Sequence, residues 1–245
     1  MHAIMTETVG HTVARNLKAA DVFAQFGIDF CQQNKWTIDK VCQANGIEPG
    51  ELFELLGSLS DPLPGEQPDF LHMPLPDLCK YIVVNHHQFL YRNVPVIEEH
   101  LVQTCKQQAG KYPELMDALE AFKNFEDIMR GHLKMEEREF FPYVRDLVKI
   151  RDDEKPFHTS WSKTCREYVD ILEDDHQRAN AFVRQACQLA HLDDPPADAC
   201  ENYKLFIFKI EELDKDVHIH IVLEDSDLHP RAIELEGQLR SAGKI

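Results

Sequence analysis

Residues 125–143 read FEDIMRGHLKMEEREFFPY, and this stretch decides the fold class. Its apolar side chains recur at steps of three and four residues, which is the spacing of one face of an α-helix and not of a β-strand. His132 and Glu136 fall on that apolar face, one helical turn apart. The stretch therefore predicts a long helix whose buried face carries an imidazole and a carboxylate.

Three other segments show the same pattern, an apolar stripe that a histidine interrupts. Together the predicted long helices span about 76–107, 113–148, 158–191 and 198–238. Alternating strand patterns and hairpin dipeptides are nearly absent. Four helices of this length joined by short connections predict an all-α protein with an up-down-up-down four-helix bundle.

Proline and glycine divide the chain into parts. The densest cluster of these helix breakers lies between Ser58 and Pro76 and predicts a linker. The segment before it favours two or three short helices: one ending near Gly27, one capped by Thr37 and one opening at Pro49. The predicted domains are a small helical module at 1–57, a proline-rich linker at 58–75, the bundle at 76–238 and a tail at 239–245.

Composition excludes several function classes. The chain has 245 residues with 26 basic and 43 acidic side chains, a net charge of −17. Nucleic acids and anionic membranes attract basic surfaces, so this charge argues against both as the main partner. No apolar run approaches the roughly 20 residues that cross a bilayer, and the N-terminus lacks the order of a secretion signal. Seven cysteines without zinc-type spacing predict a reduced, cytoplasmic protein.

The predicted helices direct four histidines and two glutamates into one core. They are His87 on the first helix, His132 and Glu136 on the second, His176 on the third, and His220 and Glu224 on the fourth. Counted from the helix ends, these residues lie at similar depth, so at about 1.5 Å per residue they can share one layer.

Such a layer suits metal ions. Buried carboxylates without partners are costly, whereas carboxylates and neutral imidazoles are ligands for divalent first-row metals. Two imidazole–carboxylate pairs and two single imidazoles suit two ions that the glutamates bridge and the histidines cap. Nitrogen and oxygen ligands without an inward cysteine favour iron or manganese over structural zinc.

The other polar residues are assigned lesser roles. Asp175 is a candidate to orient the neighbouring His176 imidazole. Tyr91 and Tyr143 are predicted to pack, and His86 and His218 fall off the apolar stripes. The histidines predicted to lie at the surface are residues 2, 11, 72, 100, 158, 191 and 229.

At these residues the sequence resembles the hemerythrin-like (HHE) superfamily, and more narrowly the iron–sulfur cluster repair di-iron family (RIC, ScdA/YtfE type). Oxygen-carrying hemerythrins usually have a second histidine four residues after the one on the third helix and an aspartate five residues after the one on the fourth, and here those positions are Asn180 and Asp225. The single histidine on the third helix and the HxxxE spacing of His220 and Glu224 on the fourth follow the repair family instead. The matching motifs are Asn85-His86-His87, His132-Leu-Lys-Met-Glu136-Glu with Phe141-Pro142, Glu173-Asp-Asp-His176, His220-Ile-Val-Leu-Glu224 with His229-Pro230-Arg231, and, in the N-terminal module, Val13-Ala-Arg-Asn-Leu, Phe26-Gly-Ile-Asp-Phe-Cys31 and Lys35-Trp-Thr-Ile.

The resemblance implies a function. It implies a non-haem protein with two Fe ions, bridged by oxo or carboxylate groups, for which Mn or Zn are substitutes. The implied role is repair of iron–sulfur clusters damaged by nitrosative or oxidative stress, through iron donation and/or NO reduction. Damaged iron–sulfur proteins and NO or O₂ are the implied partners, and a homodimer is a candidate assembly. The alternatives are a hemerythrin-type O₂/NO binding or sensing protein, an oxidase or peroxidase, and a metal-free bundle, which the buried glutamates oppose.

The chain departs from the family pattern in the N-terminal module. That module normally carries two adjacent cysteines and two glycines where this chain reads Cys31-Gln32-Gln33-Asn34. This stretch therefore has only one of the two thiols that dithiol chemistry or two-sulfur metal capture would need. A structural or vestigial role is expected for Cys31, with a mixed disulfide or transient metal contact as the alternative.

Overall fold

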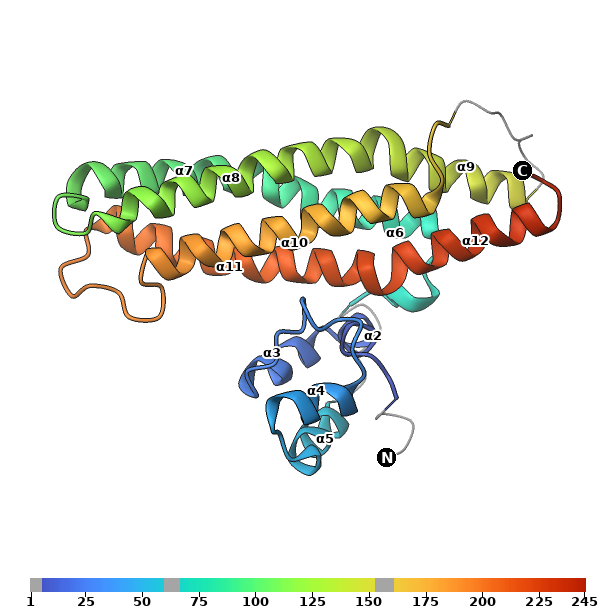
Figure 1. The fold of residues 1–245 in the computed structure, drawn as a ribbon, viewed down its shortest axis with the longest axis horizontal. Helices are drawn as coiled ribbons and strands as arrows, with labels where there is room; N and C mark the ends of the chain where they lie inside the picture. Colours follow the sequence, from blue (N-terminus) through green and yellow to red (C-terminus); the bar gives the residue numbers. More distant parts are fainter. Residues whose placement is uncertain (1–5, 60–66, 153–160) are drawn as a thin grey trace. The chain divides into compact units, whose positions relative to one another are not determined.

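The computed structural model describes residues 6–59, 67–152 and 161–245, and within them the regular secondary structure is helical (Figure 1). Among these residues β-structure is limited to isolated bridge positions, at Thr8 and Thr37, which pair with each other, and at Gln67. The all-α prediction is confirmed. Much of the predicted linker, the predicted start of the third helix at 158, and His2 and His158 lie outside the described residues, and the predicted domain boundaries remain predictions.

The long helices follow the predicted ranges closely. The first run consists of α6 (Leu75–Ile82), η2 (Val83–His87) and α7 (Gln88–Gln108), and the second of α8 (Glu114–Met135), η3 (Glu136–Phe140) and α9 (Phe141–Arg151). The third is α10 (Cys165–Leu189), and the fourth consists of α11 (Glu201–Leu223), η4 (Glu224–Leu228) and α12 (His229–Ser241). The apolar stripes therefore predicted the ends of these helices closely, except for the start of the third helix, which was predicted at 158 and lies at Cys165 because Thr164 caps the helix there.

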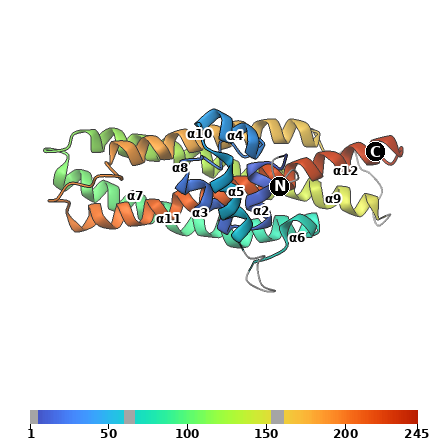
Figure 2. The same ribbon diagram turned by 90° about the horizontal axis from the view of Figure 1, so that it is seen from below.

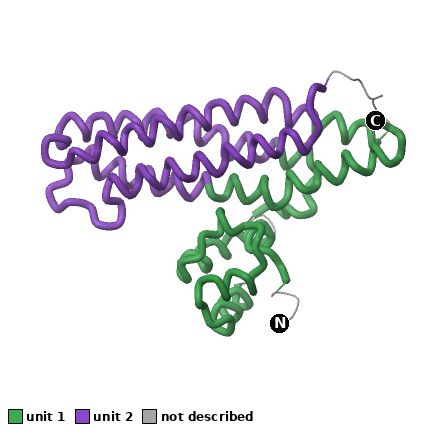
Figure 3. The backbone as a smooth tube through the Cα atoms, in the orientation of Figure 1, with its two compact units in different colours: residues 1–79, 144–160, 218–245 green, residues 80–143, 161–217 purple. Residues whose placement is uncertain are grey.

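The chain divides into two compact units (Figure 3). One unit comprises residues 80–143 and 161–217, and in it α8 packs along α10 and against α7 (Figure 1, Figure 2). Phe122, Phe125 and Val183 are completely buried in this unit. Burying a side chain of this kind stabilises the fold by about 1.5–3 kcal/mol, which explains why the predicted stripes determine the helix packing.

The other unit comprises residues 1–79, 144–160 and 218–245. Its N-terminal module contains α2 (Val9–Arg15), α3 (Lys18–Gln25), α4 (Ile38–Asn45) and α5 (Pro49–Ser58). Thr37 accepts a hydrogen bond from the Lys40 amide and begins α4, and Gly46 ends that helix with φ 65°, as predicted. The helix predicted to end near Gly27 is instead two helices, α2 and α3, because Asn16 adopts extended backbone angles and ends α2.

Within the described ranges, every helix is too short or too polar to span a bilayer.

Candidate metal centre

Three of the long helical runs contain a π-helical turn, and each of these turns includes a predicted ligand. His87 ends η2, Glu136 begins η3 and Glu224 begins η4. A π turn contains one residue more than an α-helical turn. Side chains after the π turn therefore lie on a different helix face from the one that a continuous α-helix would give them. Such turns occur frequently at functional sites. Three of the six predicted ligands therefore lie where the helix period changes, a feature that a uniform helical stripe does not predict.

The first set of predicted ligands comes from η2, α8, η3 and α10. The His87, His132 and Glu136 side chains are completely buried, and His176 is nearly so. Glu136 Oε2 lies 3.3 Å from His87 Nε2 and 3.2 Å from His132 Nε2. His132 Nε2 in turn lies 3.2 Å from His176 Nε2. One carboxylate and three imidazoles thus direct their ligand atoms into one small region.

The second set comes from the fourth helical run. His220 and Glu224 are one turn apart and completely buried, with His220 Nε2 2.9 Å from Glu224 Oε1. The spacing repeats the relation between His132 and Glu136. Each glutamate therefore begins a π turn and has an imidazole four residues before it.

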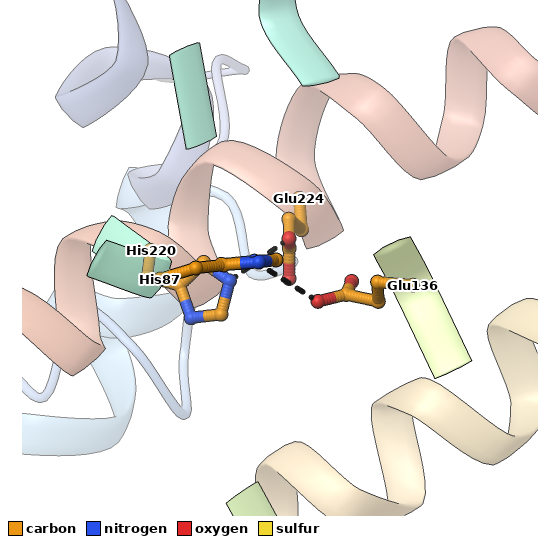
Figure 4. A group of neighbouring side chains, drawn as sticks. All are labelled: His87, Glu136, His220 and Glu224. Carbon is orange, nitrogen blue, oxygen red and sulfur yellow. Dashed lines mark hydrogen bonds and ion pairs between the residues drawn. The ribbon is translucent and has the colours of Figure 1, made fainter. Parts of the chain in front are cut away.

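The ligand atoms fall into two overlapping groups, in each of which all ligand atoms lie within 4.8 Å of one another. One group contains His87, Glu136, His220 and Glu224, and the two carboxylates point toward the imidazoles (Figure 4). The other contains His132, His176 and Glu224. Glu224 belongs to both groups, which is the position expected of a bridging carboxylate. The donor set of imidazoles and carboxylates fits divalent first-row metals.

The protonation states also fit metal binding. Burial lowers the pKa of His132, so this imidazole stays neutral near pH 7 and keeps a lone pair. Burial opposes ionisation of Glu136, but His132 and His87 outweigh it and hold the pKa of this carboxyl well below its usual range. Neutral imidazole and ionised carboxylate are the forms that bind metal, and a divalent cation would balance the buried negative charge.

Glu137 orients one of the predicted ligands. Its Oε1 lies 2.9 Å from His87 Nδ1 and accepts a hydrogen bond from the Tyr91 hydroxyl at 3.1 Å. With the proton on Nδ1, His87 donates to Glu137 and keeps its Nε2 lone pair on the side of Glu136. The predicted packing role for Tyr91 is wrong, since its side chain is 47% exposed and binds Glu137.

The sequence assigned the orienting role to Asp175 beside His176. The Asp175 carboxylate instead lies 3.2 Å from Arg178 on the same helix. The signal for Glu137 was its place directly after Glu136. Regular α-helical spacing places Glu137 at the side of the inner face, whereas the π turn η3 changes that spacing.

The positions of the remaining histidines correct one prediction. His11, His72 and His191 are exposed as predicted, and His100 is half-buried. His229, predicted to be a surface residue, is only 1% exposed, and its Nδ1 lies 3.4 Å from Asp225 Oδ1. The physical reason is that His229 directly follows the π turn η4, which turns it inward.

Several further predictions concern buried residues. Tyr143 is buried and its ring packs on Trp161, as predicted. All seven cysteines are free thiols, and Cys31 is buried, which agrees with a structural role.

His86 and His218 are also buried, although neither lies on a predicted stripe. His86 Nδ1 lies 3.0 Å from Asp216 Oδ1.

We expect Glu137→Ala to weaken metal binding by roughly 10- to 100-fold, because His87 then loses the carboxylate that orients it. Tyr91→Phe should have a smaller effect, since the contact between Glu137 and His87 remains. Competition with a chromophoric chelator measures both affinities. Glu120→Ala, an exposed change on α8, is the control, and equal affinities for Glu137→Ala and this control would contradict the assignment.

The fold and the buried imidazole and carboxylate groups define a cation-binding helical bundle. The chain belongs to the hemerythrin HHE cation binding domain family, whose family model matches residues 81–232. A second family model, ScdA_N, described as a domain of unknown function, matches residues 5–60. The two matches correspond to the bundle and to the N-terminal module.

Relatives with assigned names match over most of the chain. The iron-sulfur cluster repair protein ScdA of Staphylococcus haemolyticus is 22% identical over 207 residues, covering 84% of this chain and 89% of that protein. The iron-sulfur cluster repair protein YtfE of Edwardsiella ictaluri is 25% identical over 219 residues, covering 88% and 91%. The resemblance to the repair family is thereby confirmed.

Proposed function

We propose that this protein is a non-haem di-iron protein that repairs iron–sulfur clusters damaged by nitrosative or oxidative stress. The observation that carries the proposal is the pair of buried ligand groups that share Glu224. The names of the ScdA and YtfE relatives support the cluster-repair role. The partners that we propose are damaged iron–sulfur proteins in the cytoplasm, where the seven thiols would stay reduced.

In this proposal each ligand group holds one ion. His87 and His220 would hold the first ion, and His132 and His176 would hold the second. Glu224 belongs to both groups, and Glu136 lies within 3.3 Å of both His87 and His132, which supports both carboxylates as ligands that the two ions would share. Manganese or zinc would suit the same ligands.

Iron bound there would supply Lewis-acid and one-electron redox chemistry. Six side chains offer fewer donor atoms than two octahedral ions accept, which leaves positions for a small ligand such as NO or O₂. Glu137 holds the His87 proton at Nδ1, and the buried helix faces limit access of water to the ligand atoms. The residues thus bind and shield the ions while leaving room for exchange.

Acidification should promote iron release. Protons compete with metal for the imidazoles and carboxylates, and charging the buried His132 also destabilises the site. Because the folded-state pKa of His132 is lowered, the unfolded chain binds more protons, and this contribution to stability is lost as the pH falls below about 6.5. We expect a chelator to remove iron faster at pH 5 than at pH 7.5. Equal rates would contradict release by protonation.

Recovery of a damaged client tests the proposed function. A [4Fe–4S] enzyme inactivated by NO is incubated anaerobically with the iron-loaded protein and a reductant, and its cluster absorption and activity are followed. Recovery with the wild type and none with Glu224→Ala would support repair. Reversible oxygenation without loss of iron, and no recovery of the client, would favour an O₂/NO binding or sensing protein instead.

A further inference from the structure

The N-terminal module contacts the π turn that begins with Glu224. Helix α2 packs against η4, and both belong to the same compact unit (Figure 3). This turn carries a predicted bridging ligand, and α11 just before it carries His220. Contacts between the module and this segment can therefore affect the positions of His220 and Glu224.

A buried hydrogen bond connects the module to the residue next to Glu224. Asn34 Nδ2 donates to Asp225 Oδ2 at 3.2 Å, and the two residues are 4% and 9% exposed. The Asn34 backbone carbonyl also accepts a hydrogen bond from the Gly10 amide at 2.9 Å, near the start of α2. Asn34 thus connects α2 to η4 through both its backbone and its side chain.

A close approach of α2 to η4 adds a second contact. A Cβ atom on Gly10 would clash with Ser226 Oγ and lie 2.9 Å from Ser226 Cβ. It would also lie 3.0 Å from Asn34 Cβ. Glycine is therefore required at position 10 by space, because any larger side chain would push η4 away or displace α2.

A ring contact extends the interface to the other side of the ligand segment. The Phe30 ring meets the His218 ring edge-on, with centroids 5.6 Å apart and planes at 83°. His218 lies two residues before His220, whereas Asp225 and Ser226 follow Glu224. The module therefore contacts the chain on both sides of the predicted ligands of the fourth helical run.

We propose that the N-terminal module is a positioning element of the metal centre, in which Asn34, Gly10 and Phe30 hold residues 218–226 in place. Its relation to metal rests on the proposed function. The key contact is an amide, and it lies in the stretch Cys31-Gln32-Gln33-Asn34, where one thiol remains. In this chain the module thus acts on the metal centre through packing and a hydrogen bond, and not as a dithiol.

Loss of these contacts should loosen the Glu224 turn. A hydrogen bond to a carboxylate is stronger than one between neutral groups, and leaving the buried Asp225 without its amide donor adds a desolvation cost. With the turn freed, Glu224 leaves its ligand position more often. Metal would then dissociate faster, although all six ligands are still present.

The experiment compares Asn34→Ala and Gly10→Ala with matched changes elsewhere in the module. Asn45→Ala removes a hydrogen bond to Val41 O within α4, and Gly50→Ala adds a methyl group to open space. Hydrogen exchange at residues 218–228 is measured on the metal-free full-length protein. Manganese loss to a chelator is measured on the loaded protein.

We expect both rates to rise about tenfold in Asn34→Ala and Gly10→Ala, and to stay at the wild-type value in the two controls. Unchanged exchange within α4 shows that the module remains folded. Wild-type rates of exchange or of metal loss in Asn34→Ala would overturn the positioning role. A wild-type protein that binds no manganese or iron would instead contradict the proposed function itself, and with it the metal part of this inference.

Discussion

Glu224→Ala is expected to leave the protein without either metal ion, whereas His176→Ala is expected to leave one ion bound. Glu224 belongs to both ligand groups, and His176 belongs to only one of them. In the proposed centre, removing the shared carboxylate would take a donor from each ion and would also remove negative charge that offsets the repulsion between the two cations. His176→Ala would take a donor only from the ion that His132 would also hold. Elemental analysis of protein reconstituted anaerobically with iron(II) gives the metal content per chain.

A matched control separates ligand loss from a general effect of the substitution. Glu234→Ala removes an exposed carboxylate from α12 in the same helical run and should retain both ions. Circular dichroism of the three variants checks that the helices persist. Two ions per chain in Glu224→Ala, or the same metal content in Glu224→Ala and His176→Ala, would contradict a shared bridging position.

Metal binding should also change the stability of the fold by a large amount. A ligand that binds only the folded state stabilises it by about 4 kcal/mol when its free concentration is a thousand times its Kd. For a chain of this size that corresponds to a rise in Tm of about 10 °C. Glu136→Gln should remove most of this rise, because Glu136 contacts both His87 and His132.

The comparison needs the metal-free proteins as well as the loaded ones. Glutamine keeps the size of the Glu136 side chain but removes the charge that His132 and His87 stabilise, so the metal-free variant should unfold below the metal-free wild type, and each rise in Tm on metal addition is taken from the same variant without metal. Differential scanning calorimetry at equal free metal measures all four samples. A wild-type Tm that does not respond to iron(II) or manganese(II) would contradict a metal centre built from these residues.

The π turns change the helix faces next to three of the predicted ligands. Each of η2, η3 and η4 lies at a ligand, and each changes the helix face that is buried beyond it. His229 is the clearest case, because it directly follows η4 and is buried against the sequence-based expectation. We infer that the change of period lets one helix bury an apolar face and still direct its ligand toward the metal.

Local sequence patterns determined most of the fold and the candidate ligands. Apolar side chains at helical spacing predicted the long helices, because burial of that face decides how an amphipathic helix packs. Thr37 and Gly46 predicted the ends of α4, because capping and left-handed backbone are properties of single residues. The six candidate ligand residues could be named for the same reason, since each interrupts a stripe on its own helix.

Only the tertiary structure decided which distant groups pair. His87 and Glu137 are 50 positions apart, and Asn34 and Asp225 are 191 positions apart. The hydrogen bonds between them depend on how packed helices bring side chains together, and nothing in either local segment specifies its partner. The break in the helix at Asn16, the π turns and the space requirement at Gly10 arise in the same way. Helical periodicity in the sequence indicates which face of a helix a residue occupies. Tertiary packing decides which groups of other segments contact that face.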